Sequence, residues 1–415
     1  MLSVYEGFFS GGARIVHSDV VLGLQEGGQH HRVLSIHGEV HREATRQRME
    51  DDACYRSLTA AGVGVTSLGR SFGPGGATGS PAGFTGPELA DTARATADAD
   101  VILSLKEQPL RLLNQAGLPR RPVVVALHRS DPENQGAALD ELKAAIADGT
   151  VVACVCCAES TRAAYEAAGV PADLLHVIPN GVDLLRFRPD PARRLALRTY
   201  LGIPADAPVV VFAARYDAMK NVSLFLRAAR AWLAREPHGH VLMCGAGMTP
   251  LNPGLDADIE AAFGRRRPGT DRLHPLGVRH DMEHVYAGAD VVALTSSWGE
   301  AAPLCLVEGM MSGAVPVSTD VGDSAAIVAG HGFVTPPDEE AIAAAWSEAA
   351  TARAGLAPAL SACRERFSRT RMIAAYAALL DGVHTRAAVP PALPEPSDPV
   401  PEEGPPGPHR RPLPS

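Results

Sequence analysis

The sequence lacks any run of about 18 apolar residues, the length that a membrane-spanning helix requires. Its first residues enter a strand-like pattern without the charged start of a signal peptide. Positive charge is not in excess, because 38 Lys and Arg stand against 47 Asp and Glu, giving a net charge of −9. A phosphate backbone would be repelled by this balance. We therefore expect a cytoplasmic protein that is not a general nucleic-acid binder.

Cysteine is scarce, with seven in 415 residues, and three of them lie between Val151 and Ala158. Alternation along a strand would put Cys154 and Cys156 on one sheet face and Cys157 on the other. A metal site at these thiols is the less favoured interpretation. We expect buried strand thiols in a reducing compartment and no metal cofactor.

What the sequence does contain is a repeated alternation of short apolar segments with helix-like segments. The length of 415 residues, with 46% hydrophobic residues, is typical of a globular protein of two or three domains. The alternation favours parallel, doubly wound α/β sheets, whose ligands bind beyond the carboxyl ends of strands. The expected strands of the first half are 2–5, 33–36, 63–68, 101–105, 123–127, 151–157 and 175–178, and those of the second half are 209–213, 240–244, 272–276, 290–294, 315–318 and 332–334.

Two segments break this alternation. Residues 70–85 are rich in Gly, Pro and Ser, which predicts a mobile surface loop. From residue 388 onward the chain is dominated by Pro with Glu, Gly and Arg and lacks apolar periodicity, so residues 388–415 are predicted to be a disordered tail.

The most informative stretch runs from Ser296 to Asp323 and holds two acids, Glu300 and Glu308. A strand-like segment ends in a Ser/Trp/Gly turn, and an apolar helix, 304–311, begins just after Pro303, a residue suited to a first helical turn. A helix N-terminus that follows a strand can bind an anion through its free N–H groups. The two carboxylates could then accept hydrogen bonds from sugar or ribose hydroxyls.

Other candidate residues follow the predicted strands. Gly11 and Gly12 lie between a strand and a helix, His128 ends the strand 123–127, and Arg215 with Lys220 precedes a helix beginning near Asn221. Backbone at glycine can approach a ligand closely, and a guanidinium beside an ammonium suits a diphosphate. Each has a plainer interpretation, respectively a turn, a structural histidine and a solvated basic pair. Gly245 and Arg279 also follow strand ends, as weaker signals.

Taken together, these motifs resemble a retaining glycosyltransferase of family 4, with the two-domain GT-B architecture. The resemblance is carried by Gly11-Gly12, by Pro179 to Asp183, by Arg215 to Lys220, and by Glu300 to Glu308 followed by Gly313 to Val317. It implies an α/β protein with two Rossmann-like domains facing a cleft. Residues 1–185 would bind the acceptor, residues 186–369 would bind the nucleotide sugar, and residues 370–387 would form a helix returning to the first domain.

The resemblance also implies a reaction, the transfer of a sugar from a nucleoside diphosphate sugar to an acceptor hydroxyl with retained anomeric configuration. UDP is the commonest donor nucleotide in the family, no metal is needed, and the acceptor is a small molecule or glycan. The expected catalytic residues are His128, Arg215, Lys220 and Glu300. The expected donor-binding residues are Gly11, Gly12, Arg215, Lys220, Gly245, Arg279, Glu300, Ala301, Ala302, Pro303, Leu304 and Glu308.

The resemblance implies a distinct role for each of these residues. Arg215 and Lys220 would hold the diphosphate, Glu308 would bind ribose hydroxyls, and Glu300 would orient the donor sugar. This chain departs from the pattern at Ala301-Ala302-Pro303, where many relatives have glycine and an aromatic residue. Pro303 lacks a backbone donor, so the departure puts the donor sugar's identity in doubt more than the activity.

Three alternatives remain open at this point. A GT-B epimerase or phosphorylase would share the architecture, and a catalytically silent GT-B protein could act as a scaffold. A third alternative is a membrane-surface enzyme, because basic residues (Lys106, Arg111, Arg120 and Arg121) surround apolar ones (Leu110, Leu112, Leu113 and Leu118). A basic amphipathic helix can lie on anionic lipid, although a solvated face is the favoured interpretation here.

Overall fold

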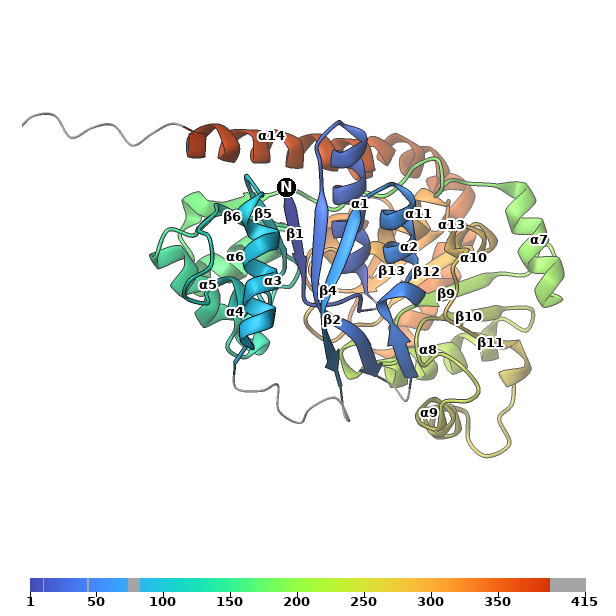
Figure 1. The fold of residues 1–415 in the computed structure, drawn as a ribbon. Helices are drawn as coiled ribbons and strands as arrows, with labels where there is room; N and C mark the ends of the chain where they lie inside the picture. Colours follow the sequence, from blue (N-terminus) through green and yellow to red (C-terminus); the bar gives the residue numbers. More distant parts are fainter. Residues whose placement is uncertain (10, 43–44, 74–82, 389–415) are drawn as a thin grey trace, which may run out of the picture.

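The computed structural model describes residues 1–9, 11–42, 45–73 and 83–388, and it contains two largely parallel sheets covered by helices (Figure 1). This arrangement confirms the predicted α/β fold with two doubly wound units. The Pro-rich segment 389–415 and the loop residues 74–82, for which we predicted disorder and mobility, lie outside the described residues.

The first sheet has eight strands in the order β3-β2-β1-β5-β6-β7-β8, with β4 also paired to β2. The pairs are parallel except for β2 with β3. Its central strands are apolar and buried along their length because helices cover both faces. The strands are β1 (Leu2–Tyr5), β2 (Arg32–Arg42), β3 (Thr45–Arg48), β4 (Gly64–Phe72), β5 (Ile102–Leu105), β6 (Val123–Leu127), β7 (Val151–Cys156) and β8 (Leu175–Val177).

The second sheet has six parallel strands in the order β11-β10-β9-β12-β13-β14. Counted from β9 this is the 3-2-1-4-5-6 order of a dinucleotide-binding fold, whose order reverses between β9 and β12. The strands are β9 (Val209–Ala213), β10 (His240–Cys244), β11 (Leu273–Gly277), β12 (Val291–Leu294), β13 (Val315–Thr319) and β14 (Phe333–Thr335).

The helices connect the strands on both faces of each sheet. Those of the first half are α1 (Gly12–Glu26), α2 (Ala53–Ala60), α3 (Gly86–Ala97), α4 (Leu110–Leu113), α5 (Ala138–Ala147) and α6 (Glu159–Ala167). Those of the second half are α7 (Pro191–Leu201), α8 (Val222–Arg235), α9 (Pro253–Phe263), α10 (Met282–Gly288), α11 (Leu304–Met311), α12 (Ser324–Val328), α13 (Glu339–Ala362) and α14 (Arg369–Ala388). None of the described helices is long and apolar enough to cross a bilayer.

The last helix, α14, leaves the second sheet and lies along the first half of the chain, beside α1 (Figure 1). Its residues Met372, Tyr376 and Leu380 are buried in one apolar cluster with Val16 and Val20 of α1. Burial of these side chains stabilises the arrangement by an amount on the order of 2 kcal/mol for each large apolar residue. Helix α14 therefore holds the two halves together.

Several local expectations need correction. Residues 70–72 belong to β4, because a parallel pairing with β2 extends to Phe72, and the antiparallel strand β3 was not predicted. The proposed basic amphipathic helix is wrong, since α4 has four residues and Leu110 and Leu112 are fully buried in the core. Two of the four leucines on which that membrane-surface alternative depended are therefore not available to lipid, and the other two, Leu113 and Leu118, are half-buried.

The thiols of β7 are arranged as the strand alternation predicted. Cys154 and Cys156 join one core cluster, whereas Cys157 packs with Ala158 and Ala301 in another. All seven cysteines in the described structure are free thiols.

Candidate functional site

The loops that follow β9 and β12 meet at the point where the strand order of the second sheet reverses. Asn221, in the left-handed region at φ 51°, donates from its side chain to the Ser297 hydroxyl at 2.9 Å. The Ser297 N–H donates to the Met219 carbonyl at 2.9 Å, and the Thr295 hydroxyl donates to the Lys220 carbonyl at 3.1 Å. The two loops are thus joined through backbone and side chains, which fixes Lys220 opposite the loop that carries Glu300.

Lys220 and Glu300, both among the expected catalytic residues, form an ion pair. The ammonium group donates to Oε1 of Glu300, and the Ser296 hydroxyl donates to the same oxygen at 2.6 Å. Glu300 is 6% exposed and the Lys220 side chain 15%, so the pair is largely removed from water. A buried ion pair at a strand's carboxyl end presents charge to a ligand in a site of low dielectric.

Two helix N-termini come together beside this pair. The N-cap residues are Gly11 for α1 and Pro303 for α11, whose side chains cannot accept a hydrogen bond. A Cβ built on Gly12 would lie 3.2 Å from Cδ1 of Leu304, so glycine is what lets α1 approach the first residue of α11. Each helix start carries partial positive charge, and their meeting makes a site suited to a multiply charged anion.

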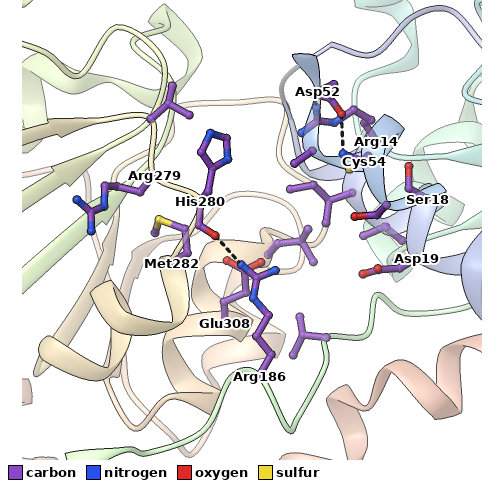
Figure 2. Close-up of a pocket in the computed structure, with 18 of the residues that line it drawn as sticks. Arg14, Ser18, Asp19, Asp52, Cys54, Arg186, Arg279, His280, Met282 and Glu308 are labelled. Atoms are coloured by element: carbon purple, nitrogen blue, oxygen red, sulfur yellow. Dashed lines mark hydrogen bonds and ion pairs between the residues drawn. The ribbon is translucent and has the colours of Figure 1, made fainter. Parts of the chain in front are cut away.

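A cavity of about 810 Å³ lies between the two halves of the chain. One wall carries Gly245, Arg279, Leu304 and Glu308 from the predicted donor-binding set, and the facing wall belongs to α1 and α2. Figure 2 shows Arg279 and Glu308 on one side, with Ser18, Asp19 and Arg14 on the other. The volume falls within the range of ligand pockets in proteins.

Two carboxyl groups of this cavity, those of Glu308 and Asp19, are in environments that disfavour their charge. Burial raises the pKa of Glu308 to about 7, although the Tyr286 hydroxyl hydrogen-bonds the group and the Arg186 charge opposes the shift. Burial likewise raises the pKa of Asp19 to about 6, against the Arg369 charge. Carboxyl groups that lack strong partners are suited to accept hydrogen bonds from the hydroxyls of a ligand.

Arg186, which the sequence did not single out, lies directly beside Glu308 (Figure 2). Its Nη2 donates to the His280 carbonyl at 3.2 Å, and its Nε donates to Glu283 at 2.9 Å. These bonds fix the guanidinium at the cavity wall. It follows the Pro179 to Asp183 motif by three residues, and the motif itself gave no signal for it.

His128 lies at the end of β6, as expected, and its imidazole is neutral. Burial, together with the nearby charge of Lys106, lowers the pKa of His128 to about 3. Within the described part of the chain, its Nε2 is buried and has no hydrogen-bond partner. A neutral imidazole with an unused nitrogen can hydrogen-bond a ligand, whereas its pKa is too low for proton exchange near pH 7.

The remaining predicted residues occupy the surrounding strand ends. Arg215 pairs with Asp217 at 3.3 Å, and Arg279 forms a paired contact with Asp281, with its Nε 2.8 Å from Oδ1. Gly245 is required by its backbone, since at φ 135° a Cβ would lie 2.0 Å from the Ala214 carbonyl oxygen. Among the described residues, the cavity lining does not include Lys220, Glu300 or His128. The predicted residues therefore form two adjoining groups, linked by Leu304 and α11.

Three polar residues contact the loop before α11, and of these the sequence had pointed only to Asn180, within the Pro179 to Asp183 motif. Ser130 donates to the Glu300 carbonyl, Asn180 donates to the Ala302 carbonyl at 3.1 Å, and Asp323 donates its N–H to the Ala301 carbonyl at 2.8 Å. Ser130 follows His128 by two residues and Asn180 lies in a motif already noted, so position after a strand was the available signal. No sequence pattern around Asp323 marks it as a residue that contacts this loop.

Each half of the chain matches the model of a known protein family. Residues 10–186 match the family described as Glycosyltransferase Family 4, and residues 207–351 match the one described as Glycosyl transferases group 1. The first match covers strands β2 to β8, and the second covers all six strands of the second sheet. Together they contain the Lys220–Glu300 pair, the two helix N-termini beside it, and Glu308 in the cavity wall.

Curated relatives and solved structures agree with these matches. The chain is 34% identical over 170 residues to a D-inositol 3-phosphate glycosyltransferase of Nocardia farcinica, covering 40% of this chain and 36% of the relative. It is 32% identical over 215 residues to the enzyme of that name from Saccharomonospora viridis, covering 49% and 47%. The chain thus spans less than half the length of these curated relatives.

Two solved structures resemble the whole described fold. HepE of Anabaena, solved in complex with UDP-glucose, has a TM-score of 0.72 at 22% identity and covers 92% of this chain and 99% of its own. Sucrose-phosphate synthase of Thermosynechococcus elongatus has a TM-score of 0.68 at 18% identity and covers 93% and 99%. At these identities the likeness concerns the fold, which is that of the GT-B glycosyltransferases.

Proposed function

This chain belongs to the family 4, group 1 glycosyltransferases, and we propose that it transfers a sugar from a nucleoside diphosphate sugar to an acceptor hydroxyl. The proposal includes a UDP-sugar as the donor and retention of the anomeric configuration. HepE of Anabaena has been solved with UDP-glucose in a fold of the same kind, which makes UDP the first nucleotide to test.

The observation that carries the proposal is the meeting of two helix N-termini beside the Lys220–Glu300 pair. The first turns of the helices read Gly-Ala-Arg in α1 and Leu-Cys-Leu in α11, and their N-cap residues are Gly11 and Pro303. Two positive helix ends and an ammonium group suit the diphosphate of a donor. Such groups stabilise the charge that develops on a leaving phosphate, at about 3 kcal/mol for each well-placed donor.

The cavity supports a place for the rest of the donor. Glu308 lines it with a carboxyl that can accept from ribose hydroxyls, and Gly245 and Arg279 surround the space that a nucleobase would fill. Glu300 would orient the donor sugar, and neutral His128 would hydrogen-bond it through a ring nitrogen. Arg215 would contact the diphosphate, and the acceptor would be deprotonated by the leaving phosphate on the same face of the sugar.

Three further parts of the proposal concern conditions and acceptor. We expect transfer without an added metal, because Lys220, Arg215 and the helix ends supply positive charge, and activity in the presence of EDTA tests this. We expect the protein to work in the cytoplasm, where seven free thiols stay reduced. The names of the curated relatives make D-inositol 3-phosphate the first acceptor to screen.

The test is calorimetric titration of UDP, GDP, ADP and dTDP into the wild type and into Glu308→Ala, without added metal. One nucleotide should bind the wild type, and its affinity should fall in Glu308→Ala. The matched control is Glu348→Ala, on the exposed side of α13, which should bind as the wild type does. The nucleotide identified in this way is then paired with candidate sugars, and NMR of the product reports the anomeric configuration.

Two results would contradict the proposed function. If no nucleotide bound the wild type at millimolar concentration, the donor site would be refuted and a silent GT-B scaffold would become the leading interpretation. Conversion of a nucleotide sugar into its epimer, with no transfer to any acceptor, would replace the proposal by an epimerase.

A further inference from the structure

Three consecutive carbonyl groups, those of Glu300, Ala301 and Ala302, are held by hydrogen bonds just before α11. Ser130 donates to the first, the Asp323 N–H to the second at 2.8 Å, and the Asn180 side chain to the third at 3.1 Å. Ser130 and Asn180 follow strands of the first sheet, whereas the loop leads into a helix of the second. The two halves of the chain therefore fix the direction of this loop jointly.

The side chain of Asp323 also contacts the first half of the chain. Its Oδ2 accepts from the Glu159 N–H and its Oδ1 from the Ser160 N–H, both at 2.9 Å. These are the first N–H groups of α6, whose own N-cap residue is Ala158, a side chain that cannot cap. A carboxylate at a helix N-terminus is stabilising, so the cap for α6 is supplied from 164 residues further along the chain.

The turn that carries Asp323 is shaped to lie against the loop. Gly322 has φ 61°, and a Cβ there would lie 2.4 Å from the Glu300 carbonyl oxygen. Glycine is therefore required for the turn to approach so closely. One residue, Asp323, thereby connects the loop before α11 with the start of α6 in the other half of the molecule.

The consequence concerns the N–H groups of the loop. In a trans peptide the C=O and N–H point in opposite directions. Hydrogen bonds that hold the Glu300 and Ala301 carbonyls on one side therefore turn the N–H groups of Ala301 and Ala302 to the other side. The Ala302 N–H acts there on the buried Cys157 thiol and opposes the rise of its pKa. Pro303 has no N–H, so the group of this loop that would meet the donor is the Ala301 N–H.

We propose that Ser130 and Asp323 are positioning residues, forming a clamp that couples closure of the two domains to the orientation of the Ala301 N–H group. This inference rests on the proposed function, because the oriented N–H group would act on the donor diphosphate. When the clamp is made, this group is aimed at the anion. When the domains part, Ser130 and the α6 cap are lost together, and the loop loses its fixed direction.

The experiment compares Ser130→Ala, Asp323→Ala and Asp323→Asn with Asp320→Ala, an exposed carboxylate in the same exit loop. Small-angle scattering of the ligand-free proteins measures the radius of gyration. The radius should increase in Ser130→Ala and Asp323→Ala and should equal that of the wild type in Asp320→Ala. Circular dichroism and the melting temperature identify any variant that has merely failed to fold, in which case Ser130→Ala, which removes one hydroxyl, gives the answer.

Kinetics supply the second measurement. Nucleotide affinity should stay within about threefold of the wild type, because Glu308, Gly245 and Arg279, which form the cavity wall of the second half, are unchanged. The value of kcat should fall about tenfold to a hundredfold, as misplaced transition-state donors do. Asp323→Asn keeps one acceptor oxygen and should recover part of both kcat and compactness.

The outcomes separate this inference from the proposed function. Equal radii in Asp323→Ala, Ser130→Ala and Asp320→Ala would overturn the clamp, even if the wild type proved to be an active transferase. So would a kcat for both variants equal to that of Asp320→Ala. If the wild type bound no nucleotide, the proposed function would fail, while an increased radius in the variants would still establish the contact between domains.

Discussion

The strand β12 has a charged cluster at each end, and the two are built differently. Asp290, just before the strand, accepts from Arg194 at 2.7 Å, Arg198 at 2.9 Å and the Val209 N–H at 2.9 Å. Arg198 also donates to carbonyl groups of Gly288, Pro204, Ala205 and Ala207. At this edge of the sheet, protein groups complete the hydrogen bonding of a buried charge.

The cluster beyond the end of β12 has a different composition. Glu300 accepts from Lys220 and Ser296, and the adjacent helices start at Gly12 and Leu304, where the N-cap side chains cannot accept hydrogen bonds. Parallel sheets collect loops and helix N-termini at the carboxyl ends of their strands. Both edges of the sheet pair their buried charges within the protein, but the edge beyond β12 also holds two helix N-termini without side-chain caps, which suits an anionic ligand.

The largest expected effect is at the first cluster. Asp290→Ala leaves Arg198, which is 2% exposed, buried without its carboxylate. Breaking a buried ion pair in this way costs about 3 to 5 kcal/mol of stability. Thermal unfolding by calorimetry should show a lower melting temperature for the second domain, with no comparable loss in Glu300→Gln. Equal destabilisation by the two substitutions would erase the distinction between the clusters.

The next effect is on activity at the second cluster. Lys220→Ala removes an ammonium group expected at the diphosphate, so kcat should fall about a hundredfold or more. The melting temperature should change less than in Asp290→Ala, because Lys220 is 15% exposed and water can replace part of its contact. Steady-state kinetics check this, and Lys220→Arg, which keeps the charge, should retain more activity than Lys220→Ala. Unchanged kcat in Lys220→Ala would contradict a role at the donor.

A smaller effect should appear as a pH dependence of stability at Glu308. Its pKa is raised by burial from 4.5 to about 7, so between these pH values the folded protein keeps a proton that the unfolded chain releases. Stability from this group is therefore lost as pH rises through that window. Glu308→Gln should raise the melting temperature at pH 8, by the equivalent of about 1 to 3 kcal/mol, and leave it unchanged at pH 4. A constant difference at both pH values would show that the effect is not ionisation.

The smallest effect is expected for an ion pair at the surface. Arg235 contacts Glu340 between α8 and α13, and the two side chains are 46% and 59% exposed. Arg235→Ala should change the melting temperature by less than about 1 °C, because water and salt screen the pair. Calorimetry of Arg235→Ala and Asp290→Ala under the same conditions compares the two melting temperatures directly. A large drop would mean that burial is not what separates the clusters.

The sequence predicted much of the second sheet and of the candidate site because the signals there are local. The bounds of α11, Leu304–Met311, match the expected range, since an apolar run directly after Pro303 has one favourable conformation. Strands β6, β9 and β10 also match, as buried apolar runs bounded by polar residues. Lys220 and Glu300 were both expected at strand ends, and the structure adds that they form an ion pair.

The errors lie where a segment's state depends on its neighbours. Residues 70–72 begin a segment rich in Gly, Pro and Ser, so composition favoured a loop, but pairing with β2 makes them strand. Leu110 and Leu112 were considered as part of a basic amphipathic helix on a membrane surface, yet the core covers both. Spacing along the sequence describes one face of a helix and cannot tell whether lipid or protein covers it.

By itself the sequence determined two α/β units, the order of their strands and helices, and the acids and bases at the strand ends. Only the tertiary structure decided that Asp323 caps α6, that Ser130 meets the Glu300 carbonyl, and that α1 starts beside α11. The reason is physical. Elements follow from local backbone preference and apolar periodicity, whereas these contacts join residues 164 and 170 positions apart, and neither partner carries a local mark of the other.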